Sequence, residues 1–359
     1  MGVNQSKIAV LCNYELLPER VGGMDYFYWM FDAKCKEQDI EIDWFFPNLS
    51  NHGGYSKLNL HSSNYKNVEN YFLDNYSNIQ YSHVITHFIE LCTPFYKKLK
   101  KRNSAKIIAI DHNPRPLSGY PLKKRLEKKT KGILYAKYID LFVGVSEYSK
   151  NQLIKELGSF IKDRIKVVCN GLEIQKFKVK SDFSVSNKFL TASHLRKDKG
   201  IQDVIYAVAA LKKKSDVPFT IDVYGEGPYE TDLKNLVNEF DLGNTINFKG
   251  SISNLHEVYS EYSYLIHPSH GETFCYTVVE ALLSNLPVIT TNDQGNVLKL
   301  VKENNNGFLF DVGDSTKLKM ILLSILNGKN TIVNGLEKEP EVLQFSLEKM
   351  VDNHIKLLQ

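Results

Sequence analysis

The chain has 359 residues, 43% of them hydrophobic and 24% charged, which is ordinary for a soluble globular protein and long enough for two domains. Its net charge of +4 is too small to indicate nucleic-acid binding, so we expect no nucleic-acid partner. No apolar run approaches the length of a membrane-spanning helix, and residues 1–7 lack the apolar core of a signal peptide. The five cysteines form no metal-ligand spacing, so we expect reduced thiols in a cytoplasmic protein.

The first half of the chain alternates short apolar runs with helical stretches. Helices are predicted, for example, at 24–38 and 147–157. The apolar runs lie at residues 8–12, 40–46, 84–86, 107–110, 141–145 and 165–168. Because most of these runs are apolar throughout, they indicate buried parallel strands with helices on both faces of the sheet.

Two loops in this half could bind a ligand. Gly22 and Gly23 follow the first strand and precede a helix, where backbone amides can approach an anion closely. A turn that needs a positive φ would explain the same two glycines. His112 follows the strand at 107–110, and ligands of open α/β sheets bind at carboxyl strand ends. A structural or solvated histidine is the alternative.

The stretch 121–138 mixes cations with large apolar residues. The cations are Lys123, Lys124, Arg125, Lys128, Lys129 and Lys131. A basic amphipathic helix can lie on an anionic membrane, where each cation contributes about 1 kcal/mol. A solvated charged face is the alternative.

The second half begins after a polar linker at 181–187 and forms a second alternating α/β pattern. Strands are predicted at 189–192, 219–224, 246–248, 264–267, 288–289 and 307–310, and helices at 201–212, 315–326 and 345–358. The predicted domains are therefore 1–180, 187–340 and a C-terminal segment at 341–359.

Two loops of this half connect a strand to a helix. The basic loop 193–200 could bind a phosphate through its cations and the following helix N-terminus, although a polar turn ending at Gly200 would also explain it. The loop Gly225-Glu226-Gly227-Pro228 is explained by a tight turn alone, with Pro228 suited to the first turn of the next helix.

Glu272 and Glu280 lie eight positions apart, one on a loop and one on the helix that follows it. If both were helical they would be about 12 Å apart along the axis. Free amides near 273–276 would lie between them. This spacing fits a ligand with hydroxyl groups at both ends and a diphosphate between them. Two solvated acids on a helix are the alternative.

The order of these motifs resembles that of the GT-B-fold retaining glycosyltransferases of family 4, over nearly the whole chain. The matching segments are Gly22-Gly23, Asp140 to Ser146, Val167 to Phe177 with its Asn-Gly-Leu-Glu core, Lys199-Gly200, Gly225-Glu226-Gly227, Phe248-Lys249-Gly250, Glu272 to Glu280 with the following Ala281 to Val288, and Phe345 to Met350. Single segments are weak signals, but eight in family order are specific.

The resemblance implies a fold and a separate function for each domain. It implies two Rossmann-like, doubly wound parallel-sheet domains facing a central cleft. The N-terminal domain would bind the acceptor, the C-terminal domain the nucleotide sugar, and the last helix would cross back to the N-terminal domain.

The resemblance also implies site residues. The catalytic set would be His112, Lys199, Arg196 and Glu272. The donor-binding set would be Gly22, Gly23, His194, Gly225, Gly250, Ser251, Thr273, Phe274, Cys275, Tyr276 and Glu280. Glu280 would hold the ribose, Glu272 the donor sugar, and Lys199 the diphosphate.

The chain departs from the family in one relevant place. Ser193-His194-Leu195 stands where Gly-Arg-Leu is common, so either His194 or Arg196 would supply the second phosphate contact. Gly295-Asn296-Val297-Leu298 also lacks a glutamate that often follows these glycines.

The implied reaction moves a hexose-type sugar, with retention, from a UDP-sugar to a glycan or lipid-linked acceptor in bacterial cell-surface polysaccharide, lipopolysaccharide or glycolipid assembly. No Asp-x-Asp tripeptide is present, which agrees with a mechanism without a metal or other cofactor. The protein would be cytoplasmic, and the basic stretch 121–138 could attach it peripherally to the membrane. A nucleotide-sugar epimerase of the same fold and a non-catalytic nucleotide-sugar-binding subunit are the alternatives. A nicotinamide dehydrogenase is disfavoured because GxGxxG does not follow the first strand.

Overall fold

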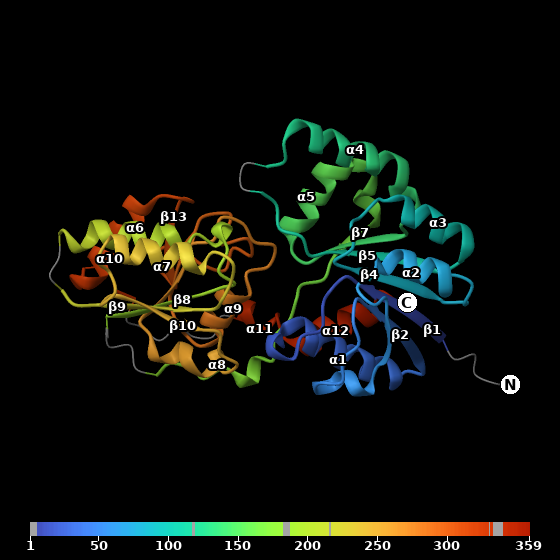
Figure 1. Ribbon diagram of the computed structural model, residues 1–359, viewed down its shortest axis with the longest axis horizontal. Coiled ribbons are helices and arrows are strands. Elements are labelled where there is room, and N and C mark those ends of the chain that lie inside the picture. Colours follow the sequence, from blue (N-terminus) through green and yellow to red (C-terminus); the bar gives the residue numbers. More distant parts are fainter. Residues whose placement is uncertain (1–5, 117–118, 182–186, 215–216, 330, 333–339) are drawn as a thin grey trace. The chain divides into compact units, whose positions relative to one another are not determined.

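A computed structural model describes residues 6–116, 119–181, 187–214, 217–329, 331–332 and 340–359 (Figure 1). Most of the predicted linker therefore lies outside the described residues. Within them the chain divides into two compact units. The first unit contains the residues up to Pro114, those between 119 and Leu172, and the segment Phe345–Gln359. The second unit contains Glu173–Gln344 together with the short segment that begins at Arg115.

The first unit is built on a parallel sheet of seven strands in the order β3-β2-β1-β4-β5-β6-β7. The strands are β1 (Ser6–Cys12), β2 (Ile40–Phe46), β3 (Asn59–Ser62), β4 (His83–His87), β5 (Lys106–Asp111), β6 (Leu141–Gly144) and β7 (Ile165–Val167). The parallel sheet confirms the sequence prediction. Strand β3 was not predicted, because this edge strand is largely polar and has no apolar run.

Helices cover both faces of this sheet. They are α1 (Gly23–Lys36), α2 (Val68–Asn75), α3 (Pro94–Arg102), α4 (Leu122–Tyr135), α5 (Glu147–Leu157) and α12 (Leu347–Ile355). Figure 1 shows α1 and α12 on one face and α2 to α5 on the other. The core under the second group includes the fully buried Phe72, Tyr96 and Leu99.

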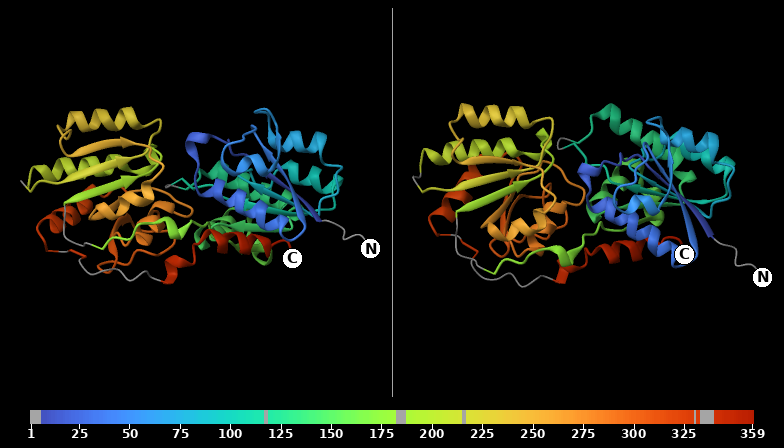
Figure 2. Two further views of the ribbon diagram at one scale, coloured as in Figure 1. Left: turned by 90° about the horizontal axis from the view of Figure 1, so that it is seen from below. Right: turned by 60° about the horizontal axis from the view of Figure 1, so that its bottom comes forward.

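The last helix, α12, belongs to the first unit although it is the last element of the chain. It lies beside α1 in every view (Figures 1 and 2). The chain before it forms a bridge with Leu172, and the amide of Gly171 lies 3.1 Å from the Sδ of Met350. The helix begins at Leu347 rather than at the predicted Phe345, because the Ser346 side chain caps it by accepting from the Lys349 amide.

The second unit contains a parallel six-stranded sheet in the order β10-β9-β8-β11-β12-β13. Its strands are β8 (Lys188–Ala192), β9 (Thr220–Tyr224), β10 (Ile246–Gly250), β11 (Tyr264–His267), β12 (Val288–Thr291) and β13 (Gly307–Phe310). Its helices are α6 (Ile201–Lys212), α7 (Glu230–Glu239), α8 (Leu255–Val258), α9 (Tyr276–Leu283), α10 (Ser315–Leu326) and α11 (Pro340–Leu343). Helices α6, α7 and α10 share the core on one face, and α8 and α9 lie on the other (Figure 1).

The strand order of each sheet reverses next to its first strand. Strand β8 pairs with β9 on one side and β11 on the other, and β1 likewise separates β2 from β4. At such a point the connections leave in opposite directions and open a crevice at the carboxyl ends of the strands. The loops after β8 and β11, and those after β1 and β4, therefore mark the expected ligand-binding edges of the two units.

The contact between Gly171 and the start of α12 provides a test of how that helix is held. A Cβ atom at position 171 would lie 2.4 Å from the Ser346 carbonyl oxygen. We expect Gly171→Ala to destabilise the first unit by about 1–3 kcal/mol in urea unfolding, since the backbone must shift. Gly22→Ala is the control, because its Cβ would meet nothing within 4 Å. Equal stability of the two variants would contradict the prediction.

Candidate functional site

Lys199 and Glu272 meet at the switch point of the second unit. Lys199 lies in the loop after β8, and Glu272 in the loop after β11, the neighbouring strand. The Lys199 Nζ is 2.6 Å from the Glu272 Oε1, and each side chain is 15% exposed. The fold thus brings together two predicted site residues that are far apart in the sequence.

His267, the last residue of β11, also contacts Glu272. Its Nε2 lies 3.3 Å from the Oε1 of Glu272, while its Nδ1 contacts the hydroxyl of Thr290 at 3.0 Å. Burial alone would raise the pKa of Glu272, but the charge of Lys199 and the contact with His267 lower that pKa to about 2. Glu272 is therefore an ionised acceptor of hydrogen bonds.

Glu280 has a different environment on α9. The hydroxyl of Tyr259 donates to its Oε2 at 2.7 Å, and burial raises the pKa of Glu280 despite this bond. Helix α9 begins only at Tyr276, after Cys275 in a left-handed conformation with φ 61°. Glu272 therefore lies on the loop and Glu280 on the helix, as predicted, and the distance of about 12 Å, which would hold only if both were helical, does not apply.

The amide-bearing segment 273–276 is fixed against the end of β8. The hydroxyl of Thr277, in the first turn of α9, donates to the carbonyl of Ala192 at 3.3 Å. Phe274 and Cys275 are buried, whereas Thr273 and Tyr276 are half-buried. The start of α9 therefore lies next to the loop that carries Lys199.

The glycines of the second unit allow close contact between two loops. A Cβ atom at Gly225 would lie 1.9 Å from the Ser193 carbonyl oxygen, and one at Gly227 would lie 2.4 Å from that of Leu195. Packing therefore explains these two glycines, because a larger residue at either position would collide with the neighbouring loop. Pro228 precedes the N-cap of α7, Tyr229, and so lies outside the first helical turn where it was predicted.

The remaining predicted residues of this unit lie along the same strand ends. His194 is exposed beside the loop contact, and Arg196 is bound to Asp198 through two bonds of 2.9 and 3.1 Å. Gly250 adopts φ 68° at the end of β10, and the amide of Ser251 lies 3.3 Å from the Glu226 Oε1.

His112 lies at the corresponding edge of the first unit, directly after β5. Its Nε2 is 3.0 Å from the Nδ1 of His87, the last residue of β4, and its ring stacks on Phe88 at 4.3 Å. Burial and the nearby His354 lower the pKa of His112 to about 3. Both rings are therefore neutral near pH 7, so one nitrogen of the pair donates and the other accepts.

The Gly22–Gly23 loop is tied to buried Asp25 in the first turn of α1. The amide of Gly22 donates to the Asp25 Oδ2 at 2.8 Å, and the hydroxyl of Tyr55 donates to its Oδ1 at 2.6 Å. The hydroxyl of Tyr14, two residues after β1, donates to the same carboxylate at 3.2 Å, which ties the loop to the carboxyl end of β1. The two glycines and His112 thus lie at the ends of β1 and β5.

Comparison with known proteins identifies the second unit. Residues 173–338 match the family described as glycosyl transferases group 1, and this range contains Lys199, Glu272 and Glu280. Residues 173–338 form a group 1 glycosyltransferase domain.

Two relatives by sequence match part of the chain, and one solved structure is similar to nearly all of it. An uncharacterized glycosyltransferase of Haemophilus influenzae is 24% identical over 62% of this chain and 68% of its own length. N-acetyl-alpha-D-glucosaminyl L-malate synthase of Bacillus anthracis is 26% identical, but the match spans only 57% of this chain and 53% of that protein. The Anabaena protein HepE, in a crystal structure with UDP and glucose, is 17% identical with a TM-score of 0.74, covering 98% of this chain and 99% of that chain. This likeness confirms the predicted GT-B fold.

Several residues that shape the glycosyltransferase domain and the first unit were missed from the sequence. His267 contacts Glu272, His87 contacts His112, and Asp25 binds the Gly22 amide. The position of His267 and His87 at the last residue of an apolar strand was the one signal that could have marked them.

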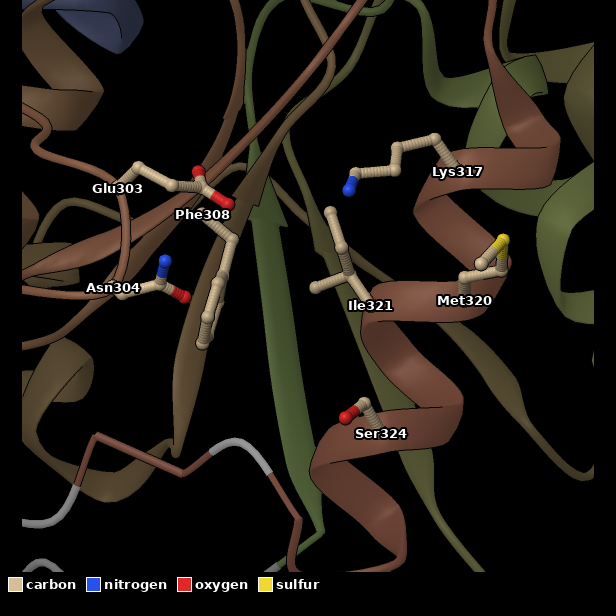
Figure 3. Close-up of a pocket in the computed structure, with 7 residues that line it drawn as sticks. All are labelled: Glu303, Asn304, Phe308, Lys317, Met320, Ile321 and Ser324. Atoms are coloured by element: carbon tan, nitrogen blue, oxygen red, sulfur yellow. The ribbon is translucent and has the colours of Figure 1, made fainter.

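The glycosyltransferase domain also contains a cavity of about 260 Å³ whose lining residues differ from the predicted site residues (Figure 3). Phe308 of β13 and Ile321 of α10 form its apolar part, and the side chains of Glu303 and Lys317 lie on its two sides.

In the part of the chain that the structure describes, no cluster of three or more His, Cys, Asp or Glu side chains could hold a metal ion. Within the same residues no helix has both the length and the apolar character to cross a membrane.

The low pKa of Glu272 makes acid stability a test of its ion pair. Its ordinary pKa is 4.5 and its value in the folded chain is about 2, so its stabilising effect is complete above 4.5 and is lost as the pH falls through about 2. We expect Glu272→Gln to be less stable than the wild type near pH 7, and this difference to shrink toward pH ~2.5 in urea unfolding.

The control for this measurement is Glu239→Gln, which changes an exposed glutamate of α7 in the same domain. A stability difference between wild type and Glu272→Gln that stays constant across this pH range would contradict the assigned pKa.

Proposed function

We propose that the protein is a retaining glycosyltransferase that moves a hexose-type sugar from a nucleotide-diphosphate sugar to an acceptor hydroxyl. The placement of Lys199 and Glu272 on adjacent strand ends, next to the start of α9, carries the proposal. This arrangement offers a cation and helix amides to a diphosphate, and an ionised carboxylate to sugar hydroxyls. The match of this segment to the group 1 family supports the same reaction.

UDP is the proposed nucleotide. The crystal structure of the Anabaena relative contains UDP and glucose, and the Bacillus anthracis relative is named for an N-acetylglucosaminyl product. A family 4 assignment is compatible with these relatives.

We assign roles to the predicted residues on this basis. Glu280 holds the ribose hydroxyls, Glu272 a hydroxyl of the donor sugar, and Lys199 the diphosphate. Arg196 or His194 supplies the second phosphate contact. The remaining donor-binding residues are Gly22, Gly23, Gly225, Gly250, Ser251, Thr273, Phe274, Cys275 and Tyr276.

The proposed chemistry depends on charge that develops at the leaving group. The bond between the anomeric carbon and the diphosphate oxygen breaks, and the acceptor oxygen bonds to that carbon on the same face. The acceptor proton passes to an oxygen of the leaving phosphate. Fixed positive groups aimed at those oxygens stabilise the transition state, and Lys199, Arg196 and the α9 amides supply them without a metal or other cofactor.

In this proposal His112 helps to position the substrate by hydrogen bonding and carries no charge. The low pKa of His112 keeps its ring neutral near pH 7. A neutral imidazole can exchange a hydrogen bond with a sugar hydroxyl but adds no positive charge.

We also propose that the enzyme acts on glycan or lipid-linked acceptors in bacterial cell-surface polysaccharide, lipopolysaccharide or glycolipid assembly, at the cytoplasmic face of an anionic membrane. The surface of α4 supports the membrane contact. Leu122, Leu126 and Ile133 are 74, 66 and 64% exposed and fall on one stripe of this helix together with Lys129.

The cations of α4 divide between two faces. Lys124, Lys128 and Lys131 are half-buried and form ion pairs with Glu127, Glu156 and Glu90. The cations at 123 and 125 flank the apolar stripe, and Lys129 lies within it. All three are exposed and form no ion pair among the described residues. Free cations beside exposed apolar side chains complement anionic lipid headgroups and the acyl boundary.

Charge reversal on the exposed face tests the membrane proposal. We expect Lys123→Glu/Arg125→Glu/Lys129→Glu to abolish sedimentation with phosphatidylglycerol vesicles while leaving donor binding unchanged. The matched control is Lys97→Glu/Lys98→Glu/Lys101→Glu on α3, which changes the net charge equally. The proposal would be refuted if both variants sedimented like the wild type, or if the wild type itself did not sediment.

Lys199 provides the test of the proposed reaction. We expect Lys199→Ala to lower the rate of sugar transfer by about 100-fold or more, because the leaving diphosphate loses its positioned cation. Lys197→Ala is the matched control, since Lys197 is exposed on the same loop. Near-normal transfer by Lys199→Ala, in protein with wild-type circular dichroism, would refute the diphosphate role.

The alternatives give different products. An epimerase would convert a nucleotide sugar in the absence of any acceptor. A non-catalytic binding subunit would bind the donor but neither transfer nor hydrolyse the sugar. A thermal-shift screen of nucleotide sugars, followed by product analysis with and without acceptor, separates these functions from transfer.

A further inference from the structure

The loop that carries Lys199 and the loop that carries Glu272 are joined by a third residue, His270. It precedes Glu272 by two positions and lies outside both strand ends. Its side chain is 20% exposed, so it is largely enclosed between the two loops.

His270 makes two bonds to the Lys199 segment, one on each side of Lys199. Its backbone amide donates to the carbonyl of Asp198 at 2.9 Å. Its Nε2 lies 2.6 Å from the Oδ2 of Asp203, in the first turn of α6, whose side chain is 10% exposed. The two bonds therefore bracket Lys199 in the chain.

The same two loops also touch through their backbones. Gly200 adopts φ 73°, and a Cβ atom there would lie 2.0 Å from the Pro268 carbonyl oxygen and 3.0 Å from the His270 ring. Such close approach leaves no room for a side chain at position 200. The contact of His270 with Asp203 is thus a second side-chain link between these segments, besides the ion pair of Lys199 with Glu272. It is short and largely shielded from water, as strong hydrogen bonds to a carboxylate are.

We propose that His270 is a positioning residue, held by Asp203, that places the Lys199 ammonium where a β-phosphate must bind. This inference rests on the proposed function. Lys199 has a long flexible side chain, so a small shift of its loop moves the ammonium away from the phosphate oxygens. His270 itself contacts neither donor nor acceptor in this proposal and acts only through Lys199 and Glu272.

The test compares UDP with UMP, because only UDP has a β-phosphate to reach Lys199. We expect His270→Ala to weaken UDP binding about 10-fold in calorimetry while UMP binding changes less than about twofold. His270→Gln should keep most of the UDP affinity, because its amide can still donate to Asp203. His256→Ala, on α8 of the same unit, is the control and should bind both nucleotides like the wild type.

A purely structural role for His270 predicts a different result. Equal losses for UDP and UMP in His270→Ala, or unchanged UDP affinity, would overturn the inference. A loss in His270→Gln as large as that in His270→Ala would also overturn it.

A second measurement separates this inference from the proposed function, since it needs no nucleotide. The coupling between Lys199 and Glu272 is obtained from a double-mutant cycle of Lys199→Ala and Glu272→Gln in urea unfolding, in wild type and in His270→Ala. We expect the coupling to fall by about half or more without His270. Unchanged coupling would refute the inference, whereas a wild type that binds neither nucleotide would refute only the proposed UDP donor.

Discussion

The pairing of β8 with β11 is the constraint on which the rest of the candidate site depends. Phe189 and Leu190 of β8 lie opposite Tyr264 and Leu265 of β11, so the two strands end at the same edge of the sheet. This register brings Lys199 within 2.6 Å of Glu272, across 73 positions of sequence. The ion pair lowers the pKa of Glu272 to about 2 and leaves the carboxylate charged, while the cation stays beside the amides of α9. A shift of the register by one residue would turn each strand side chain to the opposite face of the sheet, and Lys199 and Glu272 would no longer meet.

The first unit also gathers polar side chains at the ends of its strands, but their chemistry is different. Its switch point lies between β1 and β4, where Cys12 is opposite His87. The histidines gathered there are neutral near pH 7, since burial lowers the pKa of His87, His112 and His354 alike. The second unit thus keeps an ionised carboxylate at its strand ends, because Lys199 offsets the effect of burial on Glu272, whereas burial keeps the histidines of the first unit neutral.

Much of the fold could be predicted from the sequence because both sheets are buried on two faces. Their strands are short continuous apolar runs, and the predicted strands 40–46, 264–267 and 307–310 match the structure at both ends. The polar edge strand β3 carries no such signal. Gly22, Lys199 and Glu272 could be selected because they follow strands.

What the sequence could not supply were contacts between distant segments. His270 and Asp203 are 67 positions apart, and neither belongs to a recognisable pattern. The start of α9 could be predicted only as somewhere near 273–276, because Cys275 adopts a left-handed conformation that a non-glycine residue rarely takes. Helical periodicity cannot reveal such a residue, since it depends on backbone geometry that the surrounding structure imposes.

The bridge between Leu172 and Ser346 has a consequence for the order in which the protein can fold. The chain leaves the first unit at Leu172 and re-enters it at Phe345, and these two points are hydrogen-bonded to each other. During synthesis the whole of the second unit therefore emerges before the first unit receives α12, which covers α1 and contributes the fully enclosed Leu347 and Met350. The unit that is synthesised first is thus the one that is completed last. One face of its sheet stays partly uncovered until α12 has been synthesised, by which time the second unit can already fold.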